Sequence, residues 1–196
     1  PGSTVTFDFG ASSTLALQIV QGAPADVFAA ASQQTMDTVT AAGSASGSRV
    51  FAVNTLEIAT PASPTTPVRS LADLARPGVK VAICQPAVPC GAAAQRLFAL
   101  NQLSVTPVSE ENDVKSVLAK VELGEVDAGV VYVTDVRAAT DRVVGIAIPR
   151  DRNVTTAYPI VAITQSRDAA TARAFVDYVL SPAGQQVLTA AGFSSP

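Results

Sequence analysis

Three junctions between an expected loop and an expected helix are rich in small residues whose backbone could hold an anion. They are 10–15 (GASSTL), 86–93 (PAVPCGAA) and 110–116 (EENDVKS). The first turn of a helix presents unpaired N–H groups and about half a positive charge, so such a junction can bind an anion. Each junction alone is more simply explained as an ordinary helix cap, because Ser and Asp are common N-cap residues. The hypothesis that these junctions bind an anion therefore depends on whether the fold brings them together.

The chemistry open to this chain is limited by the residue types that it lacks. It contains no His among 196 residues, which removes His-dependent general bases and the commonest zinc ligand. No GxxxxGK[ST] loop occurs and no GxGxxG motif follows an expected strand, so nothing supports a nucleotide cofactor. Asp8, Asp26, Asp127 and Asp135 lie near expected strand ends but form no recognisable acid–base pair. The sequence therefore predicts a binding protein without a cofactor, not an enzyme.

Composition and charge narrow the class of partner. With 48% hydrophobic and 15% charged residues, the chain can bury a core, which excludes intrinsic disorder. The 13 Lys and Arg against 16 Asp and Glu give a net charge of −3, which offers no basic surface for nucleic acid. No apolar run approaches the ~20 residues that a membrane-spanning helix needs. We expect neither nucleic-acid binding nor a spanning helix.

The two cysteines, Cys84 and Cys90, enclose a loop of five residues in CQPAVPC. Without His, two thiols cannot complete the four-ligand shell of a zinc ion. A disulfide is the favoured interpretation over two free thiols, and the alternative is a pair of small buried apolar residues. A local disulfide persists in an oxidising compartment, so this interpretation predicts an extracytoplasmic protein.

Expected strands and helices alternate from one end of the chain to the other. A period-two pattern predicts a strand at 4–9 (TVTFDF), and a helix follows over about 15–20, with Ser12 or Ser13 as its N-cap and Gly22 as its C-cap. Short apolar runs predict further strands at 25–30, 49–60, 79–83, 127–133, 146–148 and 157–163. Helical spacing predicts helices at 35–42, after Ser70, at 91–100, between Asp113 and Gly124, and at 172–180 and 184–191.

This alternation predicts an α/β fold with open, mostly parallel sheets flanked by helices. We expect two lobes of normal domain size joined by two crossover strands: lobe I from residues 1–58 and 155–196, and lobe II from residues 59–154. In an open α/β sheet the junctions that follow successive strands converge at the carboxyl edge, where ligands bind. The fold therefore favours one shared site over three separate caps.

Four stretches of the sequence together resemble the substrate-binding proteins of molybdate ABC transporters, and the resemblance runs from residue 1 to residue 196. They are FGASSTLALQIVQGAPADVFAAA, PGVKVAICQPAVPCG, EENDVKSVLAKVELGEVDAGVVYVTD and LSPAGQQVLTAAGF. The first and third are specific, whereas the PGVKVAI run and the SPAGQ ending occur in many binding proteins of the same fold. The resemblance implies a two-lobed periplasmic-binding-protein fold that holds a tetrahedral oxyanion between its lobes by neutral donors.

Carried over position by position, the resemblance implies four oxyanion-binding residues. In the second lobe they are Cys90 and Val114 through their backbone N–H groups, and Tyr132 through its phenol. In the first lobe it is Ser12, through its hydroxyl and its N–H. The alternative for Tyr132 is a buried strand tyrosine with a satisfied hydroxyl. A bond between Cys84 and Cys90 would make the loop that presents the Cys90 amide more rigid.

The resemblance implies a function in transport. A monomer would bind molybdate, and tungstate as well, outside the cytoplasm and deliver it to a membrane ABC permease, either in the periplasm or at the cell surface, where a lipid anchor is an option. The alternative ligand is sulfate, which has the same charge and shape, or another tetrahedral oxyanion. A ligand-sensing domain of a transcriptional regulator is a second alternative, and an enzyme acting on a small anion is a third.

One part of the family pattern does not occur in this sequence. Family members begin with a strand, a loop whose Ser is a further ligand, and a helix, all before the Pro-Gly found here at residues 1–2. We expect lobe I to need that strand as an interior neighbour, since its absence leaves strand edges unpaired. We also expect residues 1–196 alone to bind molybdate more weakly, and to melt lower, than a chain that includes those elements.

Overall fold

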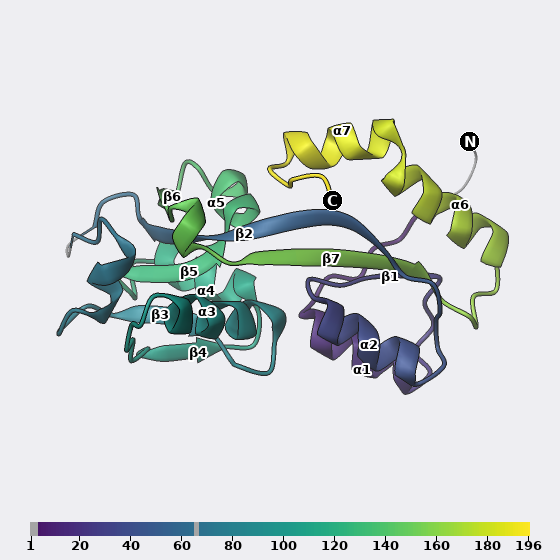
Figure 1. The fold of residues 1–196 in the computed structure, drawn as a ribbon, viewed down its shortest axis with the longest axis horizontal. Helices are drawn as coiled ribbons and strands as arrows, with labels where there is room; N and C mark the ends of the chain where they lie inside the picture. The colour runs from purple at the N-terminus through teal and green to yellow at the C-terminus, as the bar shows by residue number, and fades with distance from the viewer. Residues whose placement is uncertain (1–3, 65–66) are drawn as a thin grey trace. The chain divides into compact units, whose positions relative to one another are not determined.

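The computed structural model describes residues 4–64 and 67–196, which form two compact units, each with its own core (Figure 1). Unit 1 contains the described residues up to Val53 together with Ala157–Ala190 and Ser194–Pro196, and unit 2 contains Asn54–Thr156 and Ala191–Phe193. The chain passes from one unit to the other within two long strands, β2 (Arg49–Pro61) and β7 (Thr155–Ala162), and again on either side of the short segment Ala191–Phe193. The expected lobe boundaries, at 58/59 and 154/155, fall inside β2 and at the start of β7.

Unit 1 is built from two helices packed on a short antiparallel strand pair, with two further helices near the C-terminus. Its elements are α1 (Ser12–Val20), β1 (Val27–Ala29), α2 (Gln33–Ala41), α6 (Ala169–Leu180) and α7 (Pro182–Ala190). β1 pairs with β7, with Val27 opposite Ala162. Figure 1 shows α1 and α2 side by side. Met36 and Val39 of α2, Ile19 of α1 and Phe28 of β1 form the buried core between these helices and strands.

Unit 2 is a five-stranded mixed sheet flanked by helices. Its strand order is β6–β2–β5–β3–β4, in which β2 is antiparallel to β5 and β6, and β3 is parallel to β5 and β4. Its other elements are three α-helices and two short 3-10 helices. In chain order the elements are η1 (Leu71–Ala75), β3 (Val81–Cys84), α3 (Pro89–Leu100), β4 (Ser109–Glu111), α4 (Val114–Glu122), β5 (Ala128–Tyr132), α5 (Val133–Ala138), β6 (Val143–Ala147) and η2 (Arg150–Arg152).

The predicted parallel pairing holds for β3, β4 and β5, whereas β2 and the β1–β7 pair are antiparallel. The difference has a topological cause. Parallel neighbours need a long crossover connection, usually a helix. α3 supplies the one between β3 and β4, but β2 and β7 enter their units directly from the other unit.

The strand predicted at 4–9 is wrong. These residues form no regular secondary structure, and the side chains of Val5, Phe7 and Phe9 are 49%, 62% and 86% exposed. The rings of Phe7 and Phe9 stack on each other with centroids 5.7 Å apart. A period-two pattern becomes a strand only when a neighbour takes up its backbone hydrogen bonds. Among the described strands none pairs with residues 4–9, so the pattern alone does not form a strand.

We expect Met36→Ala to destabilise unit 1 strongly, because Met36 is fully buried at 0% exposure. Truncating a buried Met leaves a cavity and costs about 2–5 kcal/mol of unfolding free energy. Leu17→Ala is the matched control, since Leu17 lies on α1 at 54% exposure, and we expect a change within about 0.5 kcal/mol. Thermal unfolding followed by circular dichroism measures both. Equal effects would contradict the assigned core.

Candidate functional site

Three strand ends lie at one edge of the unit 2 sheet. β3, β4 and β5 run parallel, with Cys84 opposite Glu111 and Ala82 opposite Gly129. The Gln85 N–H continues this pairing by donating to the Glu111 carbonyl at 2.8 Å. Because parallel strands share a carboxyl edge, the segments that follow β3 and β4 and the last residue of β5 lie there together. Cys90, Val114 and Tyr132 belong to these segments.

The predicted disulfide is present, and it joins the end of β3 to the start of α3. Cys84 is the last residue of β3 and Cys90 the second residue of α3, with Cα atoms 5.7 Å apart. The N-cap of α3 is Val88, which makes no side-chain cap, and the first turn contains no acidic residue. The helix therefore begins with N–H groups that no described side chain caps. The backbone amide of Cys90 is one of them.

A glycine brings the start of α3 close against the strand end. A Cβ atom added at Gly91 would lie 1.9 Å from the carbonyl oxygen of Gln85, so only glycine fits. The same carbonyl accepts from the Val88 N–H at 3.1 Å. The disulfide and this close approach together hold the Cys90 amide in place relative to β3.

Val114 begins α4, and its amide is not used by the helix. The carboxylate of the N-cap residue Asp113 accepts from the backbone N–H of Ser116 at 2.8 Å and from its hydroxyl at 3.2 Å. This cap binds the N–H of Ser116, the third residue of the helix. The N–H of Val114, the first residue, points out of the helix start. The start of α4 is thus capped, as its sequence predicts, but Val114 keeps a backbone donor.

Glu111, at the end of β4, is a neighbouring carboxylate held in the charged form. The hydroxyl of Ser109 donates to it and the Lys120 ammonium lies 3.1 Å away. The Ser109 hydrogen bond, followed by Lys120, lowers the pKa of Glu111 below its usual value. Its negative charge is therefore compensated within unit 2.

Tyr132 ends β5 and is buried, with 4% exposure. Its backbone N–H donates at 3.0 Å to the carboxylate of Asp135. Asp135 is itself 5% exposed and its other oxygen lies 3.1 Å from the Lys115 ammonium. From the sequence alone, Asp135 is only a carboxylate near a strand end. One sequence signal could have indicated its role. Asp135 lies three positions after the end of a buried strand, and an acidic residue at that spacing is typical of a cap at a helix start.

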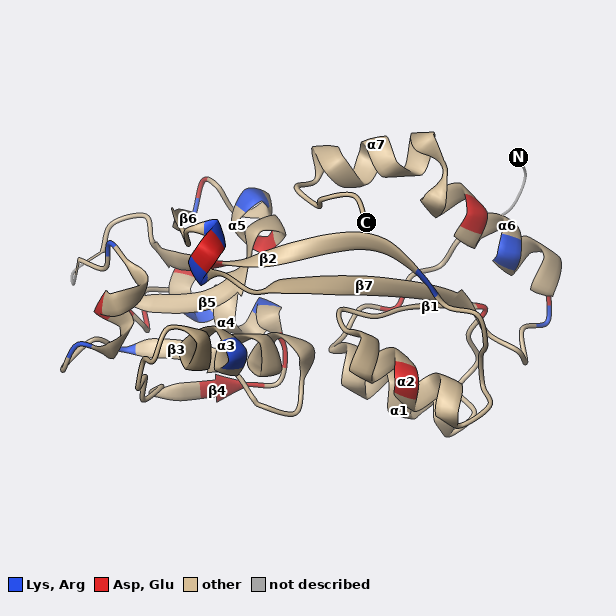
Figure 2. Ribbon diagram, in the orientation of Figure 1, with Lys and Arg blue, Asp and Glu red and all other residues tan. Residues whose placement is uncertain are grey.

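Ser12 lies in unit 1 and is the first residue of α1, not its N-cap. The predicted capping role of Ser12 or Ser13 is wrong, because the N-cap is Ala11 and no side-chain cap is present. Instead, the Ser12 oxygen accepts from the backbone N–H of Ala31 at 3.0 Å. A hydroxyl whose oxygen accepts in this way keeps its own proton to donate. α1 contains no charged residue, as Figure 2 shows, so its start offers neutral donors.

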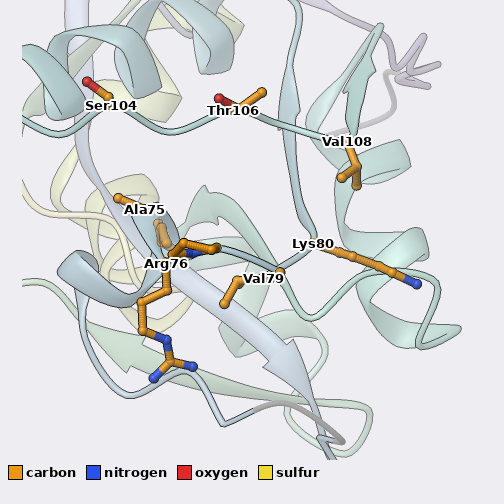
Figure 3. A pocket seen from close by; sticks show the side chains of 10 residues that line it. Ala75, Arg76, Val79, Lys80, Ser104, Thr106 and Val108 are labelled. Atoms are coloured by element: carbon orange, nitrogen blue, oxygen red, sulfur yellow. The ribbon is translucent and has the colours of Figure 1, made fainter.

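A groove of about 380 Å³ in unit 2 contains none of the predicted residues. It is lined by residues 74–80, which precede β3, and by Ser104, Thr106 and Val108. The guanidinium of Arg76 is bound to Asp73 at 3.1 Å and to the Pro67 carbonyl at 3.0 Å. Figure 3 shows the Arg76 side chain pointing away from Ser104 and Thr106. This groove lies at the amino end of β3, whereas the predicted donors of unit 2 lie at the carboxyl ends of β3, β4 and β5.

Within residues 4–64 and 67–196, no three His, Cys, Asp or Glu side chains cluster as a metal site would require. No helix in the same ranges is long and apolar enough to cross a bilayer.

Uncapped helix starts and two units connected by two long strands are features of a two-lobed solute-binding protein. The chain belongs to the family of bacterial extracellular solute-binding proteins, which matches residues 1–194. It is a binding protein and not an enzyme. The molybdate-binding protein ModA of Mycobacterium tuberculosis is 43% identical to this chain over an alignment of 197 positions, which covers 100% of this chain and 76% of that protein.

Solved structures confirm the predicted fold class. The Azotobacter vinelandii periplasmic molybdate-binding protein matches with a TM-score of 0.86 and 22% identity, covering 100% of this chain and 89% of that one. The sulfate-binding protein SubI from Mycobacterium tuberculosis also matches with a TM-score of 0.86, at 19% identity, covering 99% and 77%. Because both give the same score, the fold alone does not choose between these two anions.

We expect Gly91→Ala to destabilise the protein, although helix propensity alone predicts the opposite. Replacing a helical Gly by Ala normally stabilises by about 1 kcal/mol. Here the new Cβ would clash with the Gln85 carbonyl, and the helix start or the loop must move. Urea unfolding gives the sign of the change. A more stable variant would show that the start of α3 does not lie against Gln85.

Proposed function

We propose that this protein binds molybdate outside the cytoplasm and delivers it to a membrane ABC permease. The observation that carries the proposal is the set of neutral donors at the starts of α1, α3 and α4, two of which no described side chain caps. Two further facts support it: the membership of the extracellular solute-binding family and the 43% identity to a molybdate-binding protein. Molybdate is then the transported ligand, and no cofactor takes part.

The ligand's chemistry matches these donors. Molybdate is a dianion with four acceptor oxygens and no proton at neutral pH, so it needs donors and repels acceptors. We assign the hydroxyl and N–H of Ser12, the N–H groups of Cys90 and Val114, and the phenol of Tyr132 as its ligands. Hydrogen bonds to a charged group contribute about 1.5–3 kcal/mol each. A few such bonds give tight binding without any charged side chain, and tungstate, which has the same charge and shape, should bind as well.

The proposed role in transport determines which partners the protein has. The protein works as a monomer that presents its loaded form to the permease, and nucleic acid is not a partner. The family membership favours this reading over that of a sensing domain in a transcriptional regulator.

Calorimetric titration tests the proposal directly. The protein is titrated with molybdate, tungstate, sulfate and phosphate at one ionic strength, since surface electrostatics vary with salt. We expect saturable binding of molybdate and tungstate. Preferential binding of sulfate would replace the assigned ligand with the smaller anion, and binding of none of the four would overturn the proposal.

We expect Tyr132→Phe to weaken molybdate binding about ten- to hundredfold, because it deletes one donor to a charged ligand and keeps the ring. Ser12→Ala should do the same from the other unit. Tyr178→Phe is the control, since Tyr178 lies on α6 at 57% exposure. The dissociation constant and the ligand-free melting temperature are measured for each variant. An unchanged constant for Tyr132→Phe would make Tyr132 a structural residue.

Protein isolated without reductant should contain the Cys84–Cys90 bond, so alkylation in denaturant followed by mass spectrometry should find no free thiol. Reduction should lower molybdate affinity about three- to tenfold, because the loop that carries the Cys90 amide must then be ordered on binding. A variant with both cysteines changed to Ala should bind equally with and without reductant. If reduction left the affinity of the native protein unchanged, the close approach at Gly91 would be enough to order the loop.

A further inference from the structure

The carboxylate of Asp135 bridges two elements that carry proposed donors. One oxygen, Oδ2, accepts from the Tyr132 backbone N–H at 3.0 Å. The other, Oδ1, lies 3.1 Å from the ammonium of Lys115, and the Asp135 side chain is only 7% exposed. A single buried group therefore contacts the end of β5 and the first turn of α4.

Burial makes the two contacts depend on each other. A carboxylate removed from water is tolerated only when a counter-charge and hydrogen bonds compensate it. Lys115 supplies the counter-charge from a side chain that is 68% exposed, and the Tyr132 amide supplies a hydrogen bond. Losing Lys115 would leave an uncompensated buried charge, which is a strong reason for the carboxylate to shift or to draw in water.

The bridge acts directly on the proposed ligand set. Lys115 is the residue next to Val114 at the start of α4, and the amide that Asp135 holds belongs to Tyr132 itself. We propose that Asp135 and Lys115 are positioning residues that set the spacing between the Val114 amide and Tyr132. This inference rests on the proposed function and adds two residues that do not touch the anion.

A simple field effect makes a different prediction. If Lys115 acted only by attracting the dianion and Asp135 only by repelling it, Asp135→Asn would strengthen binding while Lys115→Met weakened it. Positioning requires both substitutions to weaken binding, since each breaks the same bridge. The sign of the Asp135→Asn effect therefore separates the two explanations.

The experiment compares molybdate dissociation constants, by calorimetry, for Asp135→Asn, Lys115→Met, the double variant and Lys115→Arg. Glu122→Gln is the matched control, because it breaks another ion pair of unit 2, with Arg142 at 2.9 Å, at the opposite end of α4. We expect each single variant to bind about tenfold more weakly and the double variant to lose little more than one of them, as coupled residues do. Lys115→Arg keeps the charge and should restore most of the affinity.

Ligand-free melting temperatures identify variants that lose affinity only because they unfold. If Asp135→Asn does not fold, Lys115→Met measured at low and at high salt carries the test, because salt screens a field effect, whereas the loss caused by a broken buried bridge persists at high salt. Tighter binding by Asp135→Asn, or additive losses in the double variant, would overturn the inference. Unchanged constants in both single variants, with molybdate binding by the native protein intact, would overturn it and leave the proposed function standing. Absence of molybdate binding by the native protein would overturn both.

Discussion

The parallel pairing of β3 with β4 and β5 is the constraint on which the unit 2 site depends. It puts the ends of three strands at one edge, with Cys84 opposite Glu111. A slip of one residue would turn every side chain of a strand to the opposite face. β3 and β5 are buried at every position, and Gly129 lies so close to α4 that an added Cβ would be 2.8 Å from Val117 and Val121. The helix is therefore seated directly on the sheet, and its start is placed by the strands beneath it.

Three carboxylates near this edge are engaged by neighbours. Asp113 caps α4, Glu111 is paired with Lys120 and Asp135 with Lys115. A free carboxylate here would repel a dianion and would itself need compensation once buried. Because Glu111 and Asp135 are paired with lysines and Asp113 is hydrogen-bonded at the helix start, backbone amides and a phenol can be the groups presented to an anion. The net charge of −3 thus says little about the local field.

Most elements were predictable because they follow local rules. Apolar spacing located α1, α2, α3, α4, α6 and α7, whereas the helix expected after Ser70 is the short 3-10 helix η1 and α5 was not predicted. Gly22 and Gly124 end α1 and α4 with φ angles of 95° and 69°, as expected of C-terminal glycines. β4 is a polar three-residue strand, SEE, that exists because β3 pairs with it, so no periodicity could reveal it. Val133 was expected to end a strand but begins α5, because the Asp135 cap decides where β5 stops.

The site itself was only partly readable from the sequence. Local signals mark Ser12 as a cap, yet its oxygen accepts from Ala31, 19 residues further along the chain, and no short-range pattern encodes that contact. The same holds for the bridge from Asp135 to Lys115. Most helix starts have a side chain that caps the first backbone N–H groups. Where no side chain does so, these N–H groups remain available to a ligand. At α1 and α3 the residues before the helix are Ala11 and Val88, whose side chains cannot cap. At α1 only the structure reveals this departure from the local rule, because Ser12 and Ser13 stand next to the helix start.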